Sequence, residues 1–405
     1  MPVEFIGALL TNDVSETRSS AAPIDARFFG RIVRAHEDAG FDRALVALAS
    51  TMPEPMQVAA QALAQTDRLG VLIAHRPGFK APTVVAREYA TLDQFSGGRV
   101  ALHTISGGVD AEQQRDGDFL EKADRYARSE EFLQVLKRAW TATEPFDHDG
   151  AYYQVRDALF PVRPFQQPRI PVFFGGSSPV AHRIAGAEAD VFATFAQPVD
   201  QIEEEIASVR AAAAAAGRSD APRFSVSFRP ILGATEELAW ARAERILETT
   251  KAAQRRDGGI VGKAFRTGTA PEPSEGFKRQ LRAAERGERH GALWTSLAAA
   301  TGQGGNSTAL VGTPETVAEA LLEYVDAGVS TLLIRGYDPL DDAIDYGRDR
   351  LPIVRPVVAR RDRARAAAGE PLIGAAPVGG AGWREDIGLV PRSVEPADVP
   401  AGAAA

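Results

Sequence analysis

The stretch Phe173-Phe174-Gly175-Gly176-Ser177-Ser178-Pro179 indicates the fold most clearly, because it joins a short apolar strand to a helix. Serine is favoured just before a helix and proline in its first turn, so a helix is expected over residues 179–187. The two glycines allow a ligand to approach the backbone closely. Hydroxyl groups and free amides at a helix N-terminus bind anions such as phosphate, although an ordinary serine cap has the same sequence. We therefore interpret this stretch as one strand–helix unit with a candidate phosphate site at its turn.

The same alternation extends in both directions from this unit. Apolar runs indicate buried parallel strands, and apolar residues spaced by three and four indicate helices. Strands are predicted at 3–10, 43–49, 68–75, 100–106, 172–175, 191–195, 224–233 and 331–336. Helices are predicted from 22–25 to 40, and over 55–65, 83–95, 125–141, 179–187, 199–216, 235–249 and 313–327. Eight such units favour an α/β fold of the (β/α)8 TIM-barrel type with insertions over a doubly wound open sheet.

Two segments interrupt the alternation. Residues 252–312, between the seventh and eighth strands, are rich in Gly, Arg, Thr and Ala, and we predict that they form a lid over the barrel. Residues 366–405 are rich in Ala, Gly and Pro and are predicted to be an irregular tail. Residues 1–365 are predicted to form one domain, because barrels of roughly 250 residues often carry insertions.

The composition excludes several classes of function. The 405 residues include no cysteine, which excludes disulfides, thiolate catalysis and cysteine metal sites. The six histidines are scattered, so no metal site is expected. The net charge of −8 argues against nucleic acid or an anionic membrane as the main partner. The apolar segment Val3–Leu10 is interrupted by Glu4 and follows no basic region, so we expect a cytoplasmic protein without a signal peptide.

Polar residues follow several predicted strands, at the end of a barrel where active sites lie. The stretch His75–Phe79 follows the third strand and either meets substrate or forms a turn in which Arg76 is ion-paired. In the fourth strand, alternation places His103 and Ile105 on one face and Thr104 and Ser106 on the other. One of these two faces must line the barrel interior.

Three further positions could carry chemistry. Arg229 shares a face of the seventh strand with Ser227, and a buried arginine requires either a counter-charge or a bound anion. Tyr126 opens the helix after the fourth strand, where its hydroxyl group either reaches a phosphate or packs in the core. Tyr337 follows the eighth strand, in a stretch that is otherwise interpreted as a solvated turn.

Together, these stretches resemble the bacterial luciferase-like family of flavin-dependent monooxygenases, nearest the alkanesulfonate monooxygenases. The resemblance extends from about residue 3 to residue 393 and rests on six separated blocks: 76–87, 91–99, 124–132, 173–178, 308–312 and 336–337. It implies a two-component system in which a separate NAD(P)H-dependent flavin reductase supplies reduced FMN. The chain would then use FMN and O2 to oxygenate a small organic substrate. In sulfonate-oxidising members this cleaves a carbon–sulfur bond. The family also implies a homodimer or homotetramer.

The strand-end patterns and the resemblance together assign roles to individual residues, and the resemblance itself carries those of Tyr126, Ser177, Ser178, His103 and Tyr337. The cofactor would be bound by His103, Ser106, Tyr126, Gly176, Ser177 and Ser178, the last two and Tyr126 at its phosphate. Catalysis would fall to Arg229, Tyr337 and His75. The substrate would contact Asn12, Met52, Arg76, Phe195 and Ser227.

The chain also departs from the sulfonate-oxidising pattern. Those enzymes carry Arg-x-His in the seventh strand, where this chain has Ser227 and Arg229, and an arginine in the lid, where residues 298–306 contain none. Asn12, Met52 and Phe195 replace a histidine, a cysteine and a tryptophan. An organosulfur substrate is therefore expected, with a sulfone, an ether-like compound or a larger organic molecule considered beside an alkanesulfonate.

Two alternatives share the fold. One is a deazaflavin-dependent oxidoreductase, which anaerobic hydride transfer to a deazaflavin would establish. The other is a non-catalytic flavin-binding paralogue, which oxygen-dependent turnover with a supplied reductase would exclude.

Overall fold

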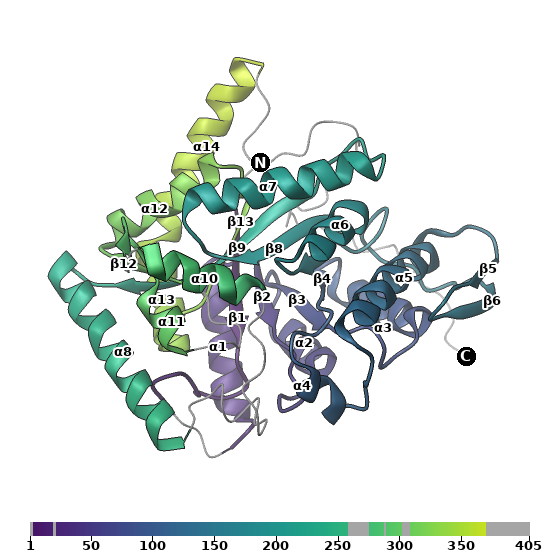
Figure 1. Ribbon diagram of the computed structural model, residues 1–405, viewed down its shortest axis with the longest axis horizontal. Helices are drawn as coiled ribbons and strands as arrows, with labels where there is room; N and C mark the ends of the chain where they lie inside the picture. The colour runs from purple at the N-terminus through teal and green to yellow at the C-terminus, as the bar shows by residue number, and fades with distance from the viewer. Residues whose placement is uncertain (1–2, 19–21, 258–274, 287–288, 302–307, 370–405) are drawn as a thin grey trace, which may run out of the picture.

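The computed structural model describes residues 3–18, 22–257, 275–286, 289–301 and 308–369, and its centre is a closed barrel of parallel strands inside a layer of helices (Figure 1). Strand β13 pairs with both β9 and β1, which closes the ring. The barrel prediction is thus confirmed and the open sheet is excluded. In order around the barrel, the strands are β1 (Glu4–Leu9), β2 (Arg43–Val46), β3 (Gly70–His75), β4 (Val100–Thr104), β7 (Val172–Gly175), β8 (Val191–Phe195), β9 (Arg223–Leu232) and β13 (Thr331–Ile334).

The helices that connect these strands lie close to their predicted positions. They are α1 (Ala26–Asp38), α2 (Pro55–Leu63), α3 (Pro82–Ser96), α5 (Lys122–Thr141), α6 (Pro179–Glu188), α7 (Val199–Ala215), α8 (Glu236–Asp257) and α12 (Pro314–Asp326). Helix α1 begins later than predicted because the Asp25 carboxylate accepts the amides of Arg27 and Phe28, at 2.9 and 3.0 Å, and so caps it. Among the described residues, no helix is both long and apolar enough to cross a bilayer.

Alternation along the strands separates the barrel interior from the helix layer. The interior is filled by one cluster of alternate strand residues: Ile6, Leu45, Leu72, Ala101, Phe173, Val191 and Leu333. The larger core lies between strands and helices and includes Ile73 of β3. His103 therefore faces the interior, two residues after Ala101, whereas His75, two residues after Ile73, faces the helices.

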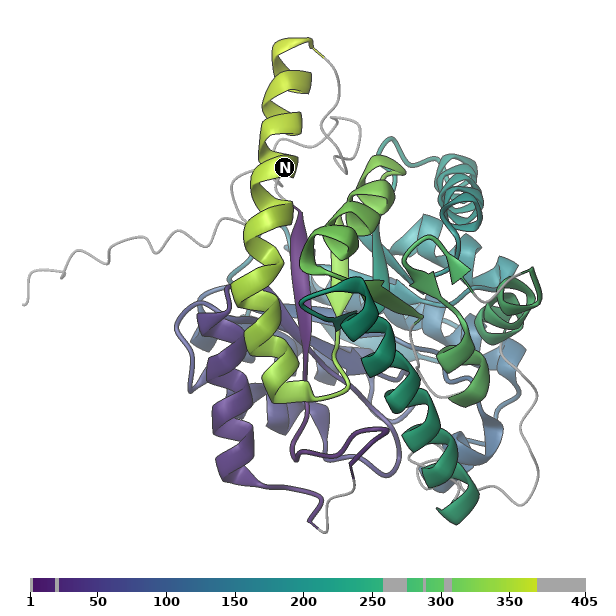
Figure 2. The same cartoon turned by 90° about the vertical axis from the view of Figure 1, so that its left-hand side faces the viewer.

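Several elements were not predicted. A hairpin of β5 (Phe146–Asp149) and β6 (Gln154–Ala158) lies outside the helix layer, at the right of Figure 1, and the short α4 (Asp110–Arg115) precedes α5. After the last barrel strand come α13 (Pro339–Asp349) and α14 (Leu351–Ala367). Figure 2 shows α14 beside β1. Arg355 of this helix forms a 2.8 Å ion pair with Asp42. Helix α14 runs slightly past the predicted start of the tail, and residues 370–405 of that tail lie outside the described residues.

The segment predicted as a lid, 252–312, contains the end of α8 and several short elements. They are α10 (Glu275–Arg286), β10 (Arg289–His290), β11 (Leu293–Trp294), α11 (Ser296–Thr301) and β12 (Ala309–Gly312). The first half of β9 pairs with β13 and β8, whereas its second half, from Arg229, pairs with β12. Residues 258–274, 287–288 and 302–307 lie outside the described residues. The role of segment 252–312 as a lid stays a prediction.

Candidate active site

The turn between β7 and α6 brings together side chains predicted to hold a phosphate. The Ser178 hydroxyl caps α6 by accepting the Ala181 amide at 3.3 Å, and it donates to the Tyr126 hydroxyl at 3.4 Å. Gly176 has a φ of +149°, and a Cβ there would lie 2.8 Å from Ala181 Cβ and 3.3 Å from Tyr126 Oη. Position 176 therefore requires glycine for its conformation and for space. The result is a backbone cradle at a helix N-terminus with hydroxyl groups beside it, which suits an anion.

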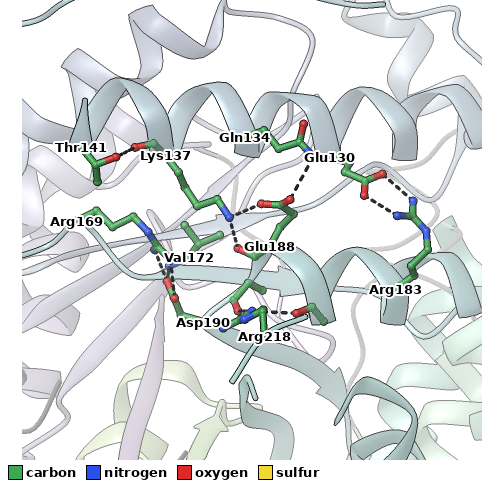
Figure 3. Close-up of polar contacts among 12 residues, drawn as sticks. Glu130, Gln134, Lys137, Thr141, Arg169, Val172, Arg183, Glu188, Asp190 and Arg218 are labelled. Carbon is green, nitrogen blue, oxygen red and sulfur yellow. Dashed lines mark hydrogen bonds and ion pairs between the residues drawn. The ribbon is translucent and has the colours of Figure 1, made fainter. Parts of the chain in front are cut away.

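Ion pairs join α5, the helix that carries Tyr126, to α6, and Figure 3 shows these pairs. Glu130, one turn after Tyr126, accepts hydrogen bonds from both terminal nitrogens of Arg183, at 2.5 and 2.7 Å. Further along, Glu188 at the end of α6 pairs with Lys137 of α5. A single ion pair at the surface contributes little to stability. Two ion pairs spaced along α5 and α6 nevertheless restrict the sliding of one helix along the other.

The base of β7 is anchored as well (Figure 3). Arg169 forms a two-pronged ion pair with Asp190, at 2.5 and 2.8 Å. The same carboxylate accepts the Val172 amide at 2.8 Å, at the first residue of the strand. Arg218 donates to the carbonyl oxygens of Gly186 and Ala189, at 2.9 and 2.7 Å, which secures the end of α6. The strand and helix on either side of the turn are thus both fixed.

Ser177, the second hydroxyl of the turn, contacts residues that sequence analysis missed. Its Oγ lies 3.4 Å from the Thr194 hydroxyl. Nearby, the buried Glu205 of α7 accepts a hydrogen bond from Arg279 of α10 at 2.8 Å. Burial raises the pKa of Glu205 although Arg279 acts in the opposite direction. Only the packing of α7 and α10 on this turn brings these side chains here.

His103 lies inside the barrel, next to the same turn. A Cβ at Gly175 would lie 3.1 Å from His103 Cε1, so glycine makes room for the ring. Burial lowers the pKa of His103 to about 4, which leaves the imidazole neutral at pH 7. Its Nδ1 atom is buried and has no hydrogen-bond partner among the described residues. A buried polar atom without a partner is costly, so this position suits contact with a polar ligand.

Arg229 is neutralised by Glu16, a residue of the loop between β1 and α1 that was not predicted as functional. The two terminal nitrogens of Arg229 donate to the two Glu16 oxygens at 2.6 and 2.7 Å. Arg335 donates to the same carboxylate at 2.8 Å. Burial alone would raise the pKa of Glu16, but the two arginines outweigh it and lower the pKa to about 2. The counter-charge that a buried arginine requires therefore comes from the chain itself.

Arg76 is neutralised in the same way. It donates to both carboxylate oxygens of Glu112, each at 2.8 Å, and lies 3.4 Å from Asp116. Glu112 belongs to the unpredicted α4 and also accepts the Ser50 amide at 2.7 Å. The structure thus contains the ion pairs that one interpretation of this stretch required, and contact of Arg76 with substrate stays a prediction.

Residues 5–331 match the family described as luciferase-like monooxygenase. The chain belongs to this family. The match covers most of the barrel, from β1 to the start of β13.

Solved structures of three other proteins have the same fold as this luciferase-like chain. EDTA monooxygenase from Chelativorans sp. BNC1 has a TM-score of 0.70 and 20% identity, covering 92% of this chain and 99% of that one. Riboflavin lyase, solved with modified FMN and riboflavin, has a TM-score of 0.71 and 21% identity, covering 93% and 94%. An F420-dependent secondary alcohol dehydrogenase has a TM-score of 0.63 and 16% identity, covering 88% and 100%. These likenesses establish the fold.

Two predicted residues of the luciferase-like chain point away from the barrel interior. His75 stacks on Phe132 of α5, with ring centroids 5.1 Å apart, and burial together with Lys80 and Arg76 lowers its pKa to about 3. Ser106 donates to the Ser129 hydroxyl of α5 at 3.0 Å. Their predicted roles in catalysis and cofactor binding stay predictions, and this placement does not support them.

The remaining predicted substrate residues of this luciferase-like chain lie on different elements. Asn12 shapes the loop that carries Glu16, since its amide donates to the Ala22 carbonyl at 2.7 Å and accepts the Val14 amide at 3.1 Å. Met52 is 45% exposed. Phe195 and Ser227 are register partners on β8 and β9. In the described part of the chain, no group of three or more His, Asp or Glu side chains is arranged to hold a metal ion.

Proposed function

We propose that this chain is a flavin-dependent monooxygenase that uses reduced FMN and dioxygen to oxygenate a small organic molecule. The observation that carries this proposal is the turn at residues 175–178. There, Ser178 donates to Tyr126 at the N-terminus of α6, and the Ser177 hydroxyl lies 3.4 Å from that of Thr194. Gly176 directly precedes these serines, in a position that leaves no room for a Cβ atom. Such a turn suits the phosphate of FMN. Membership of the luciferase-like family supports the same activity.

The interior residues suit the rest of the cofactor. Reduced FMN, when bound, supplies the electrons with which dioxygen is reduced. The residues at the carboxyl ends of β4 and β7 would border the flavin ring, with His103 as a neutral polar contact and Gly175 leaving space. The interior cluster, which includes Phe173, fills the barrel below these residues and would exclude water from that side of a bound flavin.

Three further parts of the proposal follow from the family. A separate NAD(P)H-dependent reductase would supply the reduced FMN, the chain would form a homodimer or homotetramer, and both proteins would work in the cytoplasm. The substrate would be an organosulfur compound of the alkanesulfonate or sulfone kind, and C–S cleavage would be the outcome.

Anaerobic binding of reduced FMN and reduced riboflavin tests the central claim. The wild-type chain should bind FMN far more tightly than riboflavin, because only FMN carries the phosphate. Ser177→Ala with Ser178→Ala should weaken FMN binding by roughly 10- to 100-fold, as expected for lost hydrogen bonds to a charged group, and leave riboflavin binding unchanged. Thr249→Ala, which removes an exposed hydroxyl that bonds the Arg245 carbonyl on α8, is the control. Equal binding of the two flavins by the wild type would refute the phosphate assignment.

The same preparation separates the alternatives. Oxygen-dependent product formation with a supplied reductase would support the monooxygenase. Anaerobic hydride transfer to a deazaflavin, without reaction with oxygen, would instead support the deazaflavin-dependent oxidoreductase. Flavin binding without either reaction would indicate the non-catalytic paralogue.

A further inference from the structure

The arginines at the carboxyl ends of the barrel strands all have carboxylate partners. Arg229 and Arg335 share Glu16, from the loop after β1. Arg76, on the other side of β1 in the strand order, is held by Glu112 and Asp116. Three cations thus face three anions, and with His103 neutral these groups offer no net positive charge to a substrate.

Contacts with Arg229 and within its own loop fix the position of Glu16. Its side chain is only 8% exposed, and both carboxylate oxygens are used by Arg229. Asn12 bridges the two arms of the loop by donating to the Ala22 carbonyl and accepting the Val14 amide. Within the loop, the Ser15 and Arg18 backbones exchange two hydrogen bonds at 3.1 and 3.3 Å. The carboxylate therefore occupies the place that an anionic substrate would take beside these arginines.

We propose that Glu16 is a specificity-determining residue that fills the anion position of Arg229 and Arg335, so that the site accepts molecules with an uncharged reacting end, such as sulfones, and rejects sulfonates and carboxylates. The inference rests on the proposed function in taking these strand ends as the substrate site.

The physical reason is a competition between two anions. A sulfonate could reach Arg229 only by displacing Glu16. The displaced carboxylate would lose its bidentate contact with Arg229 and would still be repelled by the nearby sulfonate. If Glu16 stayed in place, the sulfonate would face a like charge, and both terminal nitrogens of Arg229 would already be bonded to Glu16. A sulfone carries oxygen acceptors but no net charge, so it meets neither penalty.

Binding of a matched pair of probes tests this inference. Butane-1-sulfonate and butyl methyl sulfone have similar sizes and differ in charge, and calorimetry measures both with and without FMN. Glu16→Gln keeps the shape of the side chain and removes its charge. We expect this variant to bind the sulfonate at least about tenfold more tightly than the wild type, and the sulfone with an affinity within about threefold of wild type.

Two controls accompany this variant. Asp349→Asn breaks a similar bidentate pair, with Arg348 at the end of α13, and should change neither affinity. Adding Arg229→Gln to Glu16→Gln should return sulfonate binding to the wild-type level. Should Glu16→Gln fail to fold, Glu16→Gln with Arg335→Gln removes one charge of each sign and retains Arg229, and it should show the same gain.

The inference is overturned if wild type and Glu16→Gln have the same sulfonate affinity, including no measurable binding by either, or if the wild type prefers the sulfonate. Failure of the wild type to bind reduced FMN would instead overturn the proposed function. The probe comparison in flavin-free protein would remain valid in that case, so the two failures are distinguishable.

Discussion

The guanidinium carbon of Arg229 lies 3.7 Å from the centroid of the Tyr337 ring. Burial raises the pKa of the Tyr337 phenol above its ordinary value, although the cation opposes this shift. The hydroxyl group therefore stays protonated at neutral pH and can donate a hydrogen bond. Its oxygen has no partner among the described residues. Tyr337 is thus equipped to donate to a bound ligand and not to act as a base.

Tyr337→Phe should lower kcat by about 10²- to 10³-fold, as expected for loss of a hydrogen-bond donor at a reacting group, with FMN affinity unchanged. Steady-state kinetics and flavin titration measure the two effects. Tyr324→Phe is the matched control, because its buried hydroxyl donates to the Gln197 carbonyl at 2.7 Å in the structural core. It should lower the melting temperature and keep kcat. Full activity of Tyr337→Phe would contradict the assignment.

Arg229→Ala should abolish turnover, largely keep FMN binding and reduce stability. The loss of stability should be about 3 kcal/mol, because Glu16 keeps only Arg335 as its partner. Arg229→Leu with Glu16→Leu removes both charges and should recover most of that stability, since buried pairs can often be replaced by apolar side chains. Turnover should stay low in the double variant, because Tyr337 loses the cation over its ring. Denaturant unfolding and kinetics together separate the two roles.

The stability of the protein should fall in acid through Glu16. The pKa of this carboxyl group is about 2 in the folded chain and 4.5 ordinarily, so the unfolded state takes up the proton first as the pH falls. The stabilisation is complete above about pH 4.5 and is lost as the pH approaches 2, a loss of about 3 kcal/mol.

Unfolding free energies measured across this range should show a flatter profile for Glu16→Gln. Buried histidines affect stability at higher pH. The pKa of His36 and that of His103 are lowered from 6.5 to about 4, so the stability that they contribute is lost as the pH falls from about 6.5 to about 4, in the wild type and in Glu16→Gln alike. An identical slope for variant and wild type below pH 4.5 would count against the depressed pKa.

His103→Leu should weaken FMN and riboflavin binding by similar factors, because His103 is proposed to contact the flavin ring that both share. The expected change is roughly tenfold for the loss of one hydrogen bond. This contrasts with the serine variants of the turn, which should affect FMN alone. Anaerobic titrations with both flavins measure the ratio. A selective loss of FMN binding would place His103 at the phosphate instead.

Gly176→Ala should weaken FMN binding by tenfold or more, because the new Cβ would lie 2.8 Å from Ala181 Cβ and displace the start of α6. Gly217→Ala is the matched control: its φ is +74°, but nothing lies within 4 Å of the added Cβ. Both changes should cost about 1–2 kcal/mol of stability through backbone strain. Only Gly176→Ala should change flavin affinity, and equal effects on binding would refute the role of the turn.

Much of the fold was predictable because parallel strands buried on both faces form continuous apolar runs, as in Val71–Ile73 of β3. The elements that were missed have weaker local patterns. Strands β10 to β12 contain two to four residues each, too few for an alternation to be recognised. The start of α1 was misplaced because the capping contact of Asp25 depends on side-chain geometry.

The sequence by itself determined the eight strand–helix units and the Gly-Gly-Ser-Ser turn after the fifth barrel strand, because both depend on neighbours along the chain. Only the tertiary structure decided that His103 faces the interior and His75 the helices, and that Glu16 neutralises Arg229 from a position 213 residues away. The physical reason is that a buried arginine pairs with a carboxylate that lies within reach once the strands have closed into a barrel. No local spacing in the sequence specifies which carboxylate that is.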